Sequence, residues 1–216
     1  MKQQGRNSRK LPQEILIFGE NKHDSDSLKC LIEAINPSLN DRVLIRVQRD
    51  PGSLTKDANL PKIKDWMARI SQTIEARAAV ADIVGVIVHQ DADGPDDSCA
   101  EILRSALTKN VTPPAYPVVP VQETEAWWYL FPDCLRGVKP IAWREVKMPT
   151  NINVESIFNP KEDLQRRTRV AAPKHAYSEA DSLAVAQRMA DAISKGIIPE
   201  NRAPSWDRFL DLAKQL

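Results

Sequence analysis

The apolar run from Asp82 to Val88 constrains the fold of this chain more than any other segment. After Asp82 it contains only Ile, Val and Gly, so the predicted strand has apolar residues on both faces. Burial on both faces is typical of a central strand in a parallel sheet that helices cover on both sides. The run continues into His89-Gln-Asp-Ala-Asp93, which places polar residues at the carboxyl end of this strand.

Three further apolar runs predict strands, at Glu14–Phe18, Arg42–Val47 and Val118–Val121. The prolines around the last of these favour an edge or a strand terminus. In the segments between the predicted strands, apolar residues recur at the spacing of an α-helix. Helices are predicted at Leu28–Ile35 after the N-capping group Asp24–Ser27, from about Leu60 with an apolar stripe reaching Ile74, at Ala100–Leu107, and at Glu123–Tyr129. This order predicts an α/β fold, a parallel sheet flanked by helices.

The pattern changes after Pro132. Residues 133–160 lack periodicity and are interpreted as a long loop with one short helix at most. Ser178-Glu-Ala-Asp181 resembles a capping box that opens a helix ending at Gly196, and a last helix is predicted at Trp206–Leu216. Residues 1–12 are therefore expected to be a flexible leader, 13–135 an α/β core, and 136–216 a loop and helical extension packed on that core.

Composition limits the function classes. The 30 basic and 29 acidic residues nearly cancel, so no overall field draws the chain to nucleic acid, and a partner or a local basic face would have to supply phosphate contacts. Cys30, Cys99 and Cys134 are odd in number and far apart, which fits a reducing cytoplasm rather than a disulfide framework. No apolar stretch approaches the roughly 20 residues that span a bilayer, so a cytoplasmic protein is expected.

Acidic residues follow three of the four predicted strands. Glu20 follows the first, Asp91 and Asp93 the third, and Glu123 and Glu125 the fourth. The carboxyl ends of parallel strands meet at one edge, where ligands gather, and clustered carboxylates repel one another unless a cation compensates them. Mg²⁺ or Mn²⁺ suits such oxygen ligands. The alternative interpretation is that these acids cap helices or lie in solvated turns, as Asp and Glu commonly do.

Two motifs give the chain a family resemblance. Ile15-Leu-Ile-Phe-Gly-Glu20 with Asp24, and Val86-Ile-Val-His-Gln-Asp-Ala-Asp93, resemble the Toprim signature. Glu125-Ala-Trp127 and Asn159-Pro-Lys-Glu162 are similar to elements of small stand-alone Toprim proteins of the domain-of-unknown-function 4276 type, which are related to the OLD-family nucleases. The resemblance runs from about residue 13 to 170 and implies a Toprim-like core. Asn21 departs from the pattern, which commonly has Gly there.

The resemblance implies a role for each matching residue. Asp91 and Asp93 would hold Mg²⁺, Glu20 would bind metal or act as general base, and Glu125, with Glu123 as the weaker candidate, would complete a second metal position. Lys161 would neutralise charge on the phosphate or the leaving oxygen. Proteins of this type often work beside an ATPase in bacterial anti-phage defence, so an ATPase partner is expected.

Other residues are weaker candidates. Phosphate contacts are expected from His23, Arg166, Arg167, Arg169 and Lys174, each of which is also interpretable as a solvated side chain. His89 leans toward Asp91 but is interpreted as a structural group. Trp127, Trp128 and Tyr129 are adjacent, so they are not expected all to face one core. Helix packing explains at least two of them, and exposure of the third, to stack on a base or meet a partner, is the alternative.

Two other function classes stay open. One is a non-enzymatic Toprim-like regulatory or recognition subunit, against which the retained acids count. The other is a D-x-D enzyme, either a glycosyltransferase or an aspartyl phosphatase. The phosphatase fits poorly because its D-x-D follows the first strand, whereas here it follows the third. The oligomeric state also stays open, with a homodimer as the expectation for a small subunit.

Overall fold

A computed structural model describes residues 11–52, 54, 60–92, 94 and 98–216. The sheet and its helices come first along the chain: β1 Gln13–Phe18, α1 Lys22–Ile35, β2 Val43–Gln48, α2 Leu60–Ala78, β3 Asp82–His89, α3 Ser98–Asn110 and β4 Ala115–Val118. The remaining helices are α4 Pro132–Arg136, α5 Pro160–Ala171, α6 Ser182–Ser194 and α7 Pro204–Gln215. Short 3-10 helices lie at η1 Pro37–Leu39, η2 Thr124–Tyr129, η3 Ile141–Glu145, η4 Val154–Ser156 and η5 Glu179–Asp181.

The four strands form one parallel sheet in the order β2-β1-β3-β4. The two strands with the most continuous apolar character, β1 and β3, occupy the centre. Val86, Ile87 and Val88 of β3 have no exposed surface, which confirms the expectation of burial on both faces. The α/β fold with a parallel sheet flanked by helices and a C-terminal helical extension is therefore confirmed.

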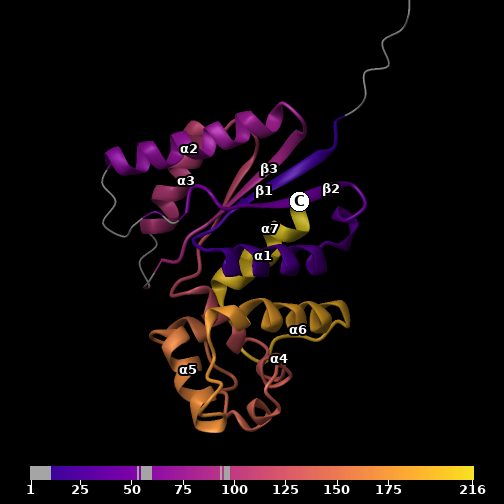
Figure 1. Ribbon diagram of the computed structural model, residues 1–216, viewed down its shortest axis with the longest axis vertical. Coiled ribbons are helices and arrows are strands. Elements are labelled where there is room, and N and C mark those ends of the chain that lie inside the picture. The colour runs from indigo at the N-terminus through magenta and orange to yellow at the C-terminus, as the bar shows by residue number, and fades with distance from the viewer. Residues whose placement is uncertain (1–10, 53, 55–59, 93, 95–97) are drawn as a thin grey trace, which may run out of the picture.

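Helices cover both faces of the sheet (Figure 1). Leu16 and Val86 point to the face covered by α2 and α3, while Ile15 and Ile87 point to the face covered by α1. The apolar stripe of α2, which includes Met67 and Ile70, is buried on the first face. Among the residues that the structure describes, no helix is long and apolar enough to cross a membrane.

The C-terminal helices extend the core on the α1 side. Figure 1 shows α6 lying against α1, with α4 and α5 below it, while α7 reaches back toward the sheet beside α1. The buried residues of α6 and α7, such as Met189 and Phe209, belong to the same apolar cluster as Ile15 of β1. The extension and this face of the sheet thus share one core.

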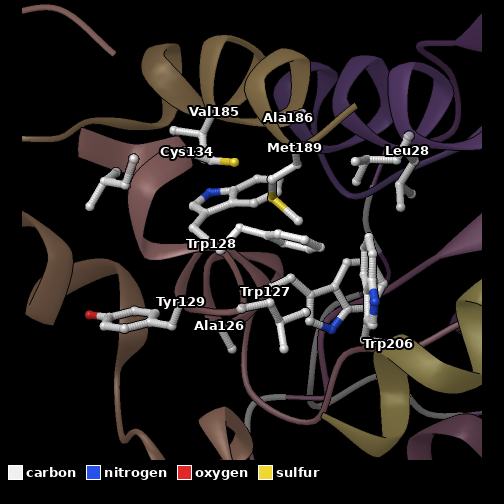
Figure 2. Close-up of a cluster of buried hydrophobic side chains, with 14 of the residues drawn as sticks. Leu28, Ala126, Trp127, Trp128, Tyr129, Cys134, Val185, Ala186, Met189 and Trp206 are labelled. Atoms are coloured by element: carbon white, nitrogen blue, oxygen red, sulfur yellow. The ribbon is translucent and has the colours of Figure 1, made fainter. Parts of the chain in front are cut away.

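Three adjacent aromatic residues of η2 lie at the centre of this core. The expectation that they do not all face one core is wrong, because Trp127, Trp128 and Tyr129 are all fully buried in it. Figure 2 shows why: Trp127 points toward Trp206, Trp128 toward α6, and Tyr129 away from both. Adjacent side chains of a 3-10 helix point in different directions, and here a different part of the extension covers each one.

Several element boundaries differ from the sequence predictions. The fourth strand starts at Ala115 and ends at Val118, because its pairing with β3 begins directly after Pro114 and continues through Pro117. Its place at the sheet edge agrees with those prolines. α1 starts at Lys22 and is capped by Asn21, so Asp24–Ser27 lie inside it. The predicted loop 133–160 contains more helix than expected, since nearly all of α4 and the whole of η3 and η4 lie in it. α5 begins at Pro160, the last residue of that loop, and continues through residues for which no helix was predicted; Pro160 occupies its first turn, where a missing N–H costs nothing.

Candidate metal centre

The carboxyl ends of β1 and β3 bring the predicted acidic residues together. Glu20 follows β1 and Asp91 follows β3, and the side chain of Glu20 accepts hydrogen bonds at Oε2 from the Asp91 backbone N–H at 3.2 Å and from Gln90 Nε2 at 3.1 Å. Gln90 in turn accepts a hydrogen bond from the Leu54 backbone N–H at 3.0 Å, which ties the segment after β2 to this edge. Asp93 lies outside the described residues.

The N-terminus of α1 adds a carboxylate that the sequence prediction treated as a helix cap. Asn21 takes the capping role, since its Oδ1 accepts the backbone N–H groups of His23 and Asp24. Asn21 Nδ2 also donates to Asp24 Oδ2 at 2.7 Å, which holds the Asp24 carboxyl group in place. Asp24 is buried, and burial, with the charges of Asp91 and Glu20 adding to it, raises its pKa to about 7 although His89 acts in the opposite direction.

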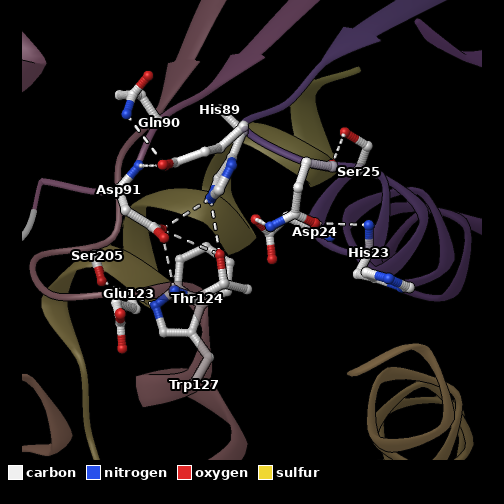
Figure 3. Close-up of polar contacts among 12 residues, drawn as sticks. His23, Asp24, Ser25, His89, Gln90, Asp91, Glu123, Thr124, Trp127 and Ser205 are labelled. Carbon is white, nitrogen blue, oxygen red and sulfur yellow. Dashed lines mark hydrogen bonds and ion pairs between the residues drawn. The ribbon is translucent and has the colours of Figure 1, made fainter. Parts of the chain in front are cut away.

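His89, the last residue of β3, lies between Asp91 and Asp24 (Figure 3). Its Nε2 is 2.8 Å from Thr124 Oγ1 and 3.3 Å from Asp91 Oδ1. Burial alone lowers the pKa of this imidazole, but the hydrogen bond and charge of Asp91, joined by Asp24 and Glu20, raise it to about 9. His89 was interpreted as structural, and its position two residues before Asp91 was the sequence signal for a closer role.

Asp91 also orients the start of η2. Its Oδ1 accepts the Thr124 backbone N–H at 3.1 Å and the Thr124 hydroxyl at 3.3 Å. Only 13% of the Asp91 side chain is exposed. The carboxylate is therefore held in a fixed direction by η2, and η2 carries the next acidic residues of the site.

Glu125 is the most deeply buried of the acids that follow the strands, among those that the structure describes. It is 4% exposed, and burial raises its pKa to about 8, with the charges of Asp24 and Asp91 adding to the effect. The hydroxyl of Tyr177 donates to Glu125 Oε1 at 3.3 Å, and Tyr177 is itself fixed by Trp128 Nε1 at 2.9 Å and by Ser182 Oγ at 2.7 Å. A glutamate in this setting carries a proton at neutral pH unless a cation replaces it.

Glu123 and Lys161 join the site to α5. Glu123 Oε2 accepts the Lys161 backbone N–H at 3.1 Å and so caps α5, a different helix from the one it precedes. Lys161 Nζ lies 3.0 Å from Glu179 Oε1 and 3.6 Å from Glu123 Oε1. Burial raises the pKa of Glu123 despite Lys161, whereas these acids raise the pKa of Lys161 despite its own burial. This geometry supports a structural role for Glu123.

Two open clefts flank the buried acids. One, of about 330 Å³, is lined by Glu20, Asn21 and Arg49 among others. The other, of about 470 Å³, is lined by Lys161, Tyr177 and Glu179 among others. A substrate could therefore approach the acidic residues from the Glu20 side or from the Lys161 side.

The residues predicted to bind phosphate do not gather at this site. Arg166 and Arg167 both form ion pairs with Asp163 on their own helix, and Arg169 lies about 12 Å along α5 from Lys161. Lys174 is exposed beyond the end of α5. The ring of His23 extends away from Asp91 and His89 in Figure 3.

The donor groups fit a divalent cation. One ligand atom from each of Asp24, His89 and Asp91 lies within 4.8 Å of the others, and Glu20 is tied to this group through its hydrogen bond with the Asp91 backbone N–H. The charges of Asp24 and Asp91 both raise the pKa of Glu125. Carboxylate oxygens are ligands of Mg²⁺ and Mn²⁺, and a bound cation would favour the ionised form of carboxyl groups whose pKa values burial raises. The sequence prediction missed Asp24 and His89 as members of this group.

The wider comparisons leave the family of the chain open. No model of a known protein family matches the sequence, and a search of curated proteins finds no match.

Proposed function

We propose that this chain is a metal-dependent nuclease of the Toprim type, which cleaves phosphodiester bonds in DNA or RNA. The observation that carries the proposal is the convergence of Glu20, Asp24 and Asp91 at the carboxyl edge of the sheet, with Glu125 on the adjoining η2. Carboxyl groups this close oppose one another's ionisation, and a divalent cation removes that opposition. The resemblance of the motifs around Glu20 and Asp91 to the Toprim signature supplies the reaction class.

In the proposed reaction, Asp91 and Asp24 would hold Mg²⁺ or Mn²⁺, with Asp93 and Glu125 as further ligands. Such an ion lowers the pKa of a bound water and stabilises charge on a phosphate. Glu20 lines the cleft of about 330 Å³ and would accept the proton of the attacking water. Lys161 lines the other cleft, where its ammonium would face the phosphate or the leaving oxygen.

We further propose that the chain is the effector of a bacterial anti-phage defence system and works in the cytoplasm with an ATPase partner. The formal net charge of +1 provides little general attraction to nucleic acid. Arg166 and Arg167 are already paired with Asp163, so they offer little to a phosphate backbone. A partner that supplies phosphate contacts would compensate for both features.

A non-enzymatic regulatory subunit is the second candidate, and one observation favours it. Two positive side chains already lie among the acids. His89, whose pKa is raised to about 9, is paired with Asp91, and Lys161 is paired with Glu123 and Glu179. A cluster balanced in this way can be stable without a metal ion.

Cleavage assays on the purified full chain distinguish the two candidates. The protein is incubated with Mg²⁺ or Mn²⁺ and with supercoiled plasmid, single-stranded DNA or total tRNA in separate reactions, with EDTA as a control. The test variant is Asp91→Asn, and the matched control is Asp82→Asn, which changes an exposed Asp at the opposite end of the same strand.

Cleavage by the wild type and by Asp82→Asn, lost in Asp91→Asn and in EDTA, is the expected result, and the cleaved substrate identifies the nucleic acid. Absence of cleavage together with absence of metal binding by calorimetry would refute the nuclease proposal and favour the regulatory subunit. Metal binding without cleavage, lost in Asp91→Asn, would retain the metal centre and make the ATPase partner the next component to add.

A further inference from the structure

His89 brings an imidazole into an otherwise carboxylate-lined group. It is 1% exposed, it comes from the end of the central strand β3, and its Nε2 faces Asp91 Oδ1 at 3.3 Å. Figure 3 shows the ring between Asp91 and Asp24 rather than behind them. A nitrogen donor is therefore present where the proposed function needs only oxygens.

The separations suit ligands of one ion. Two ligands that each lie about 2.1 Å from an ion are about 3.0 Å apart at a right angle and about 4.2 Å apart across it. The Nε2–Oδ1 distance of 3.3 Å matches the first arrangement, and the ligand atoms of Asp24, His89 and Asp91 all lie within 4.8 Å of one another. Side-chain movements of a few tenths of an ångström would bring all three within reach of one ion.

The hydrogen bonding of His89 is incomplete within the protein. Among the described residues, no group hydrogen-bonds to its Nδ1, although that atom is buried. A histidine that serves only to support a fold normally has both ring nitrogens satisfied, because an unpaired buried polar atom costs free energy. The carboxylates that face Nε2 are the observation that indicates a ligand at this ring, whereas the unpaired Nδ1 is the other ring nitrogen and does not by itself identify a ligand.

We propose that His89 is a nitrogen ligand of the cation site and that it gives the site a preference for Mn²⁺ over Mg²⁺. The inference rests on the metal centre of the proposed function. Mg²⁺ takes oxygen ligands almost exclusively, whereas first-row transition ions bind mixed nitrogen and oxygen sites more strongly. The imidazole binds in its neutral form, so a proton leaves His89 for solvent when the ion enters.

The direct test is electron spin-echo spectroscopy of the wild-type protein with one equivalent of Mn²⁺. A coordinated imidazole gives nitrogen modulation from ¹⁴N, which changes when the histidines alone carry ¹⁵N. The chain has three histidines, so His89→Gln is compared with His23→Gln beside the cluster and with His175→Gln, an exposed histidine on the extension. Only His89→Gln is expected to lose the signal.

Calorimetric titration of the same four proteins with Mn²⁺ and with Mg²⁺ gives an independent result. The wild type is expected to bind Mn²⁺ at least about tenfold more tightly than Mg²⁺, and His89→Gln to lose about tenfold or more in Mn²⁺ affinity, with Mg²⁺ affinity changed much less. Gln still offers a side-chain hydrogen bond to Thr124 or Asp91, so the neighbouring contacts are retained as far as possible.

The outcomes separate this inference from the proposed function. Mn²⁺ binding without histidine modulation, or with the same metal preference in His89→Gln, would overturn the ligand role and leave the metal centre intact. Tighter Mn²⁺ binding by His89→Gln would also overturn it, because the residue would then act only as a competing positive charge. Failure of the wild type to bind either ion would refute both proposals. If His89→Gln does not fold, the spectrum of the wild-type protein still decides.

Discussion

At the scale of single residues, Gly19 controls how closely β1 approaches α1 before Glu20. A Cβ built at this position would overlap Ser25 Oγ, and the Ser25 hydroxyl donates a hydrogen bond to the Asn21 backbone carbonyl at 2.9 Å. Gly19→Ala is expected to destabilise the protein by about 1–3 kcal/mol through this overlap. Chemical denaturation measures the loss, and adding Ser25→Ala should restore part of it. A neutral effect of Gly19→Ala would show that the contact relaxes freely.

Glu125 gives the metal-free protein a pH-dependent stability. Its folded-state pKa of about 8 lies above its ordinary value of 4.5, so the folded state retains a proton that the unfolded state releases. Stability is therefore expected to fall as pH rises from about 5 to 8, and the raised pKa values of Asp24 and His89 act in the same direction. Glu125→Gln should flatten this fall by an amount on the order of a few kcal/mol.

Thermal melts in EDTA across this pH range would measure the effect. Glu33→Gln on α1, a partly exposed glutamate in an i,i+4 pair with Lys29, is the control and should keep the wild-type slope. An unchanged slope in Glu125→Gln would place the titrating groups elsewhere.

The residues of the site were predictable to the extent that they follow strands. Glu20, Asp91 and Glu125 were found because the carboxyl ends of parallel strands meet at one edge. Asp24 was interpreted as a cap, because sequence does not reveal that Asn21 caps the helix first and so turns Asp24 inward. The ion pairs of Arg166 and Arg167 with Asp163 depend on a helix that the sequence pattern did not predict.

At the scale of elements, η2 links the sheet to the extension through Trp127. Its indole stacks on Phe209 with ring centroids 5.1 Å apart, meets Trp206 edge-on at 5.4 Å, and donates to Ser205 Oγ at 3.0 Å. Trp127→Ala is expected to cost about 3–5 kcal/mol. Phe158→Ala, which removes an aromatic ring that is 77% exposed, should change stability by no more than about 0.5 kcal/mol. Equal effects in denaturant titrations would contradict the central role of η2.

The capping box before α6 offers a second test at this scale. Asp181 Oδ2 accepts hydrogen bonds from the Ser178 backbone N–H at 2.9 Å and from the Ser178 hydroxyl at 3.0 Å. Ser178→Ala is expected to cost about 0.5–2 kcal/mol. Ser38→Ala in η1, remote from this cap, is the comparison, and hydrogen exchange of the α6 amides should increase only in Ser178→Ala.

Elements with a strong local pattern were predicted well, and elements that depend on distant packing were not. The apolar run of β3 and the capping box at Ser178 are visible in sequence because local chemistry determines them. Burial of all three aromatic residues in η2 depends on partners more than 30 residues away, such as Asp163 for Tyr129 and Tyr177 for Trp128. Without knowledge of these distant partners, three adjacent aromatic residues in a sequence suggest that one of them is exposed.

At the scale of the whole molecule, α7 completes the core that the sheet begins. Trp206 and Phe209 of α7 are buried against Trp127, and Asn36 after α1 donates through Nδ2 to the Ala213 carbonyl at 3.2 Å. A chain lacking residues 203–216 is expected to lose cooperative unfolding rather than to leave an intact sheet domain. Circular dichroism melts measure this. A sharp transition of the shortened chain at the melting temperature of the full-length protein would show that the sheet is stable by itself.

The proposed metal centre takes its residues from segments that are widely separated along the chain. Glu20 and Asp24 come from the first sheet crossover, His89 from the end of β3 and Asp91 from the segment after it. Glu125 comes from η2, and Tyr177, which donates a hydrogen bond to Glu125, comes from the segment before α6. Such long-range contacts close late in folding, because each closure requires ordering of the chain between them. A folding intermediate with a formed sheet but an undocked extension would thus lack the oriented Glu125, so any hydrolytic activity of the centre would arise only after the extension had docked.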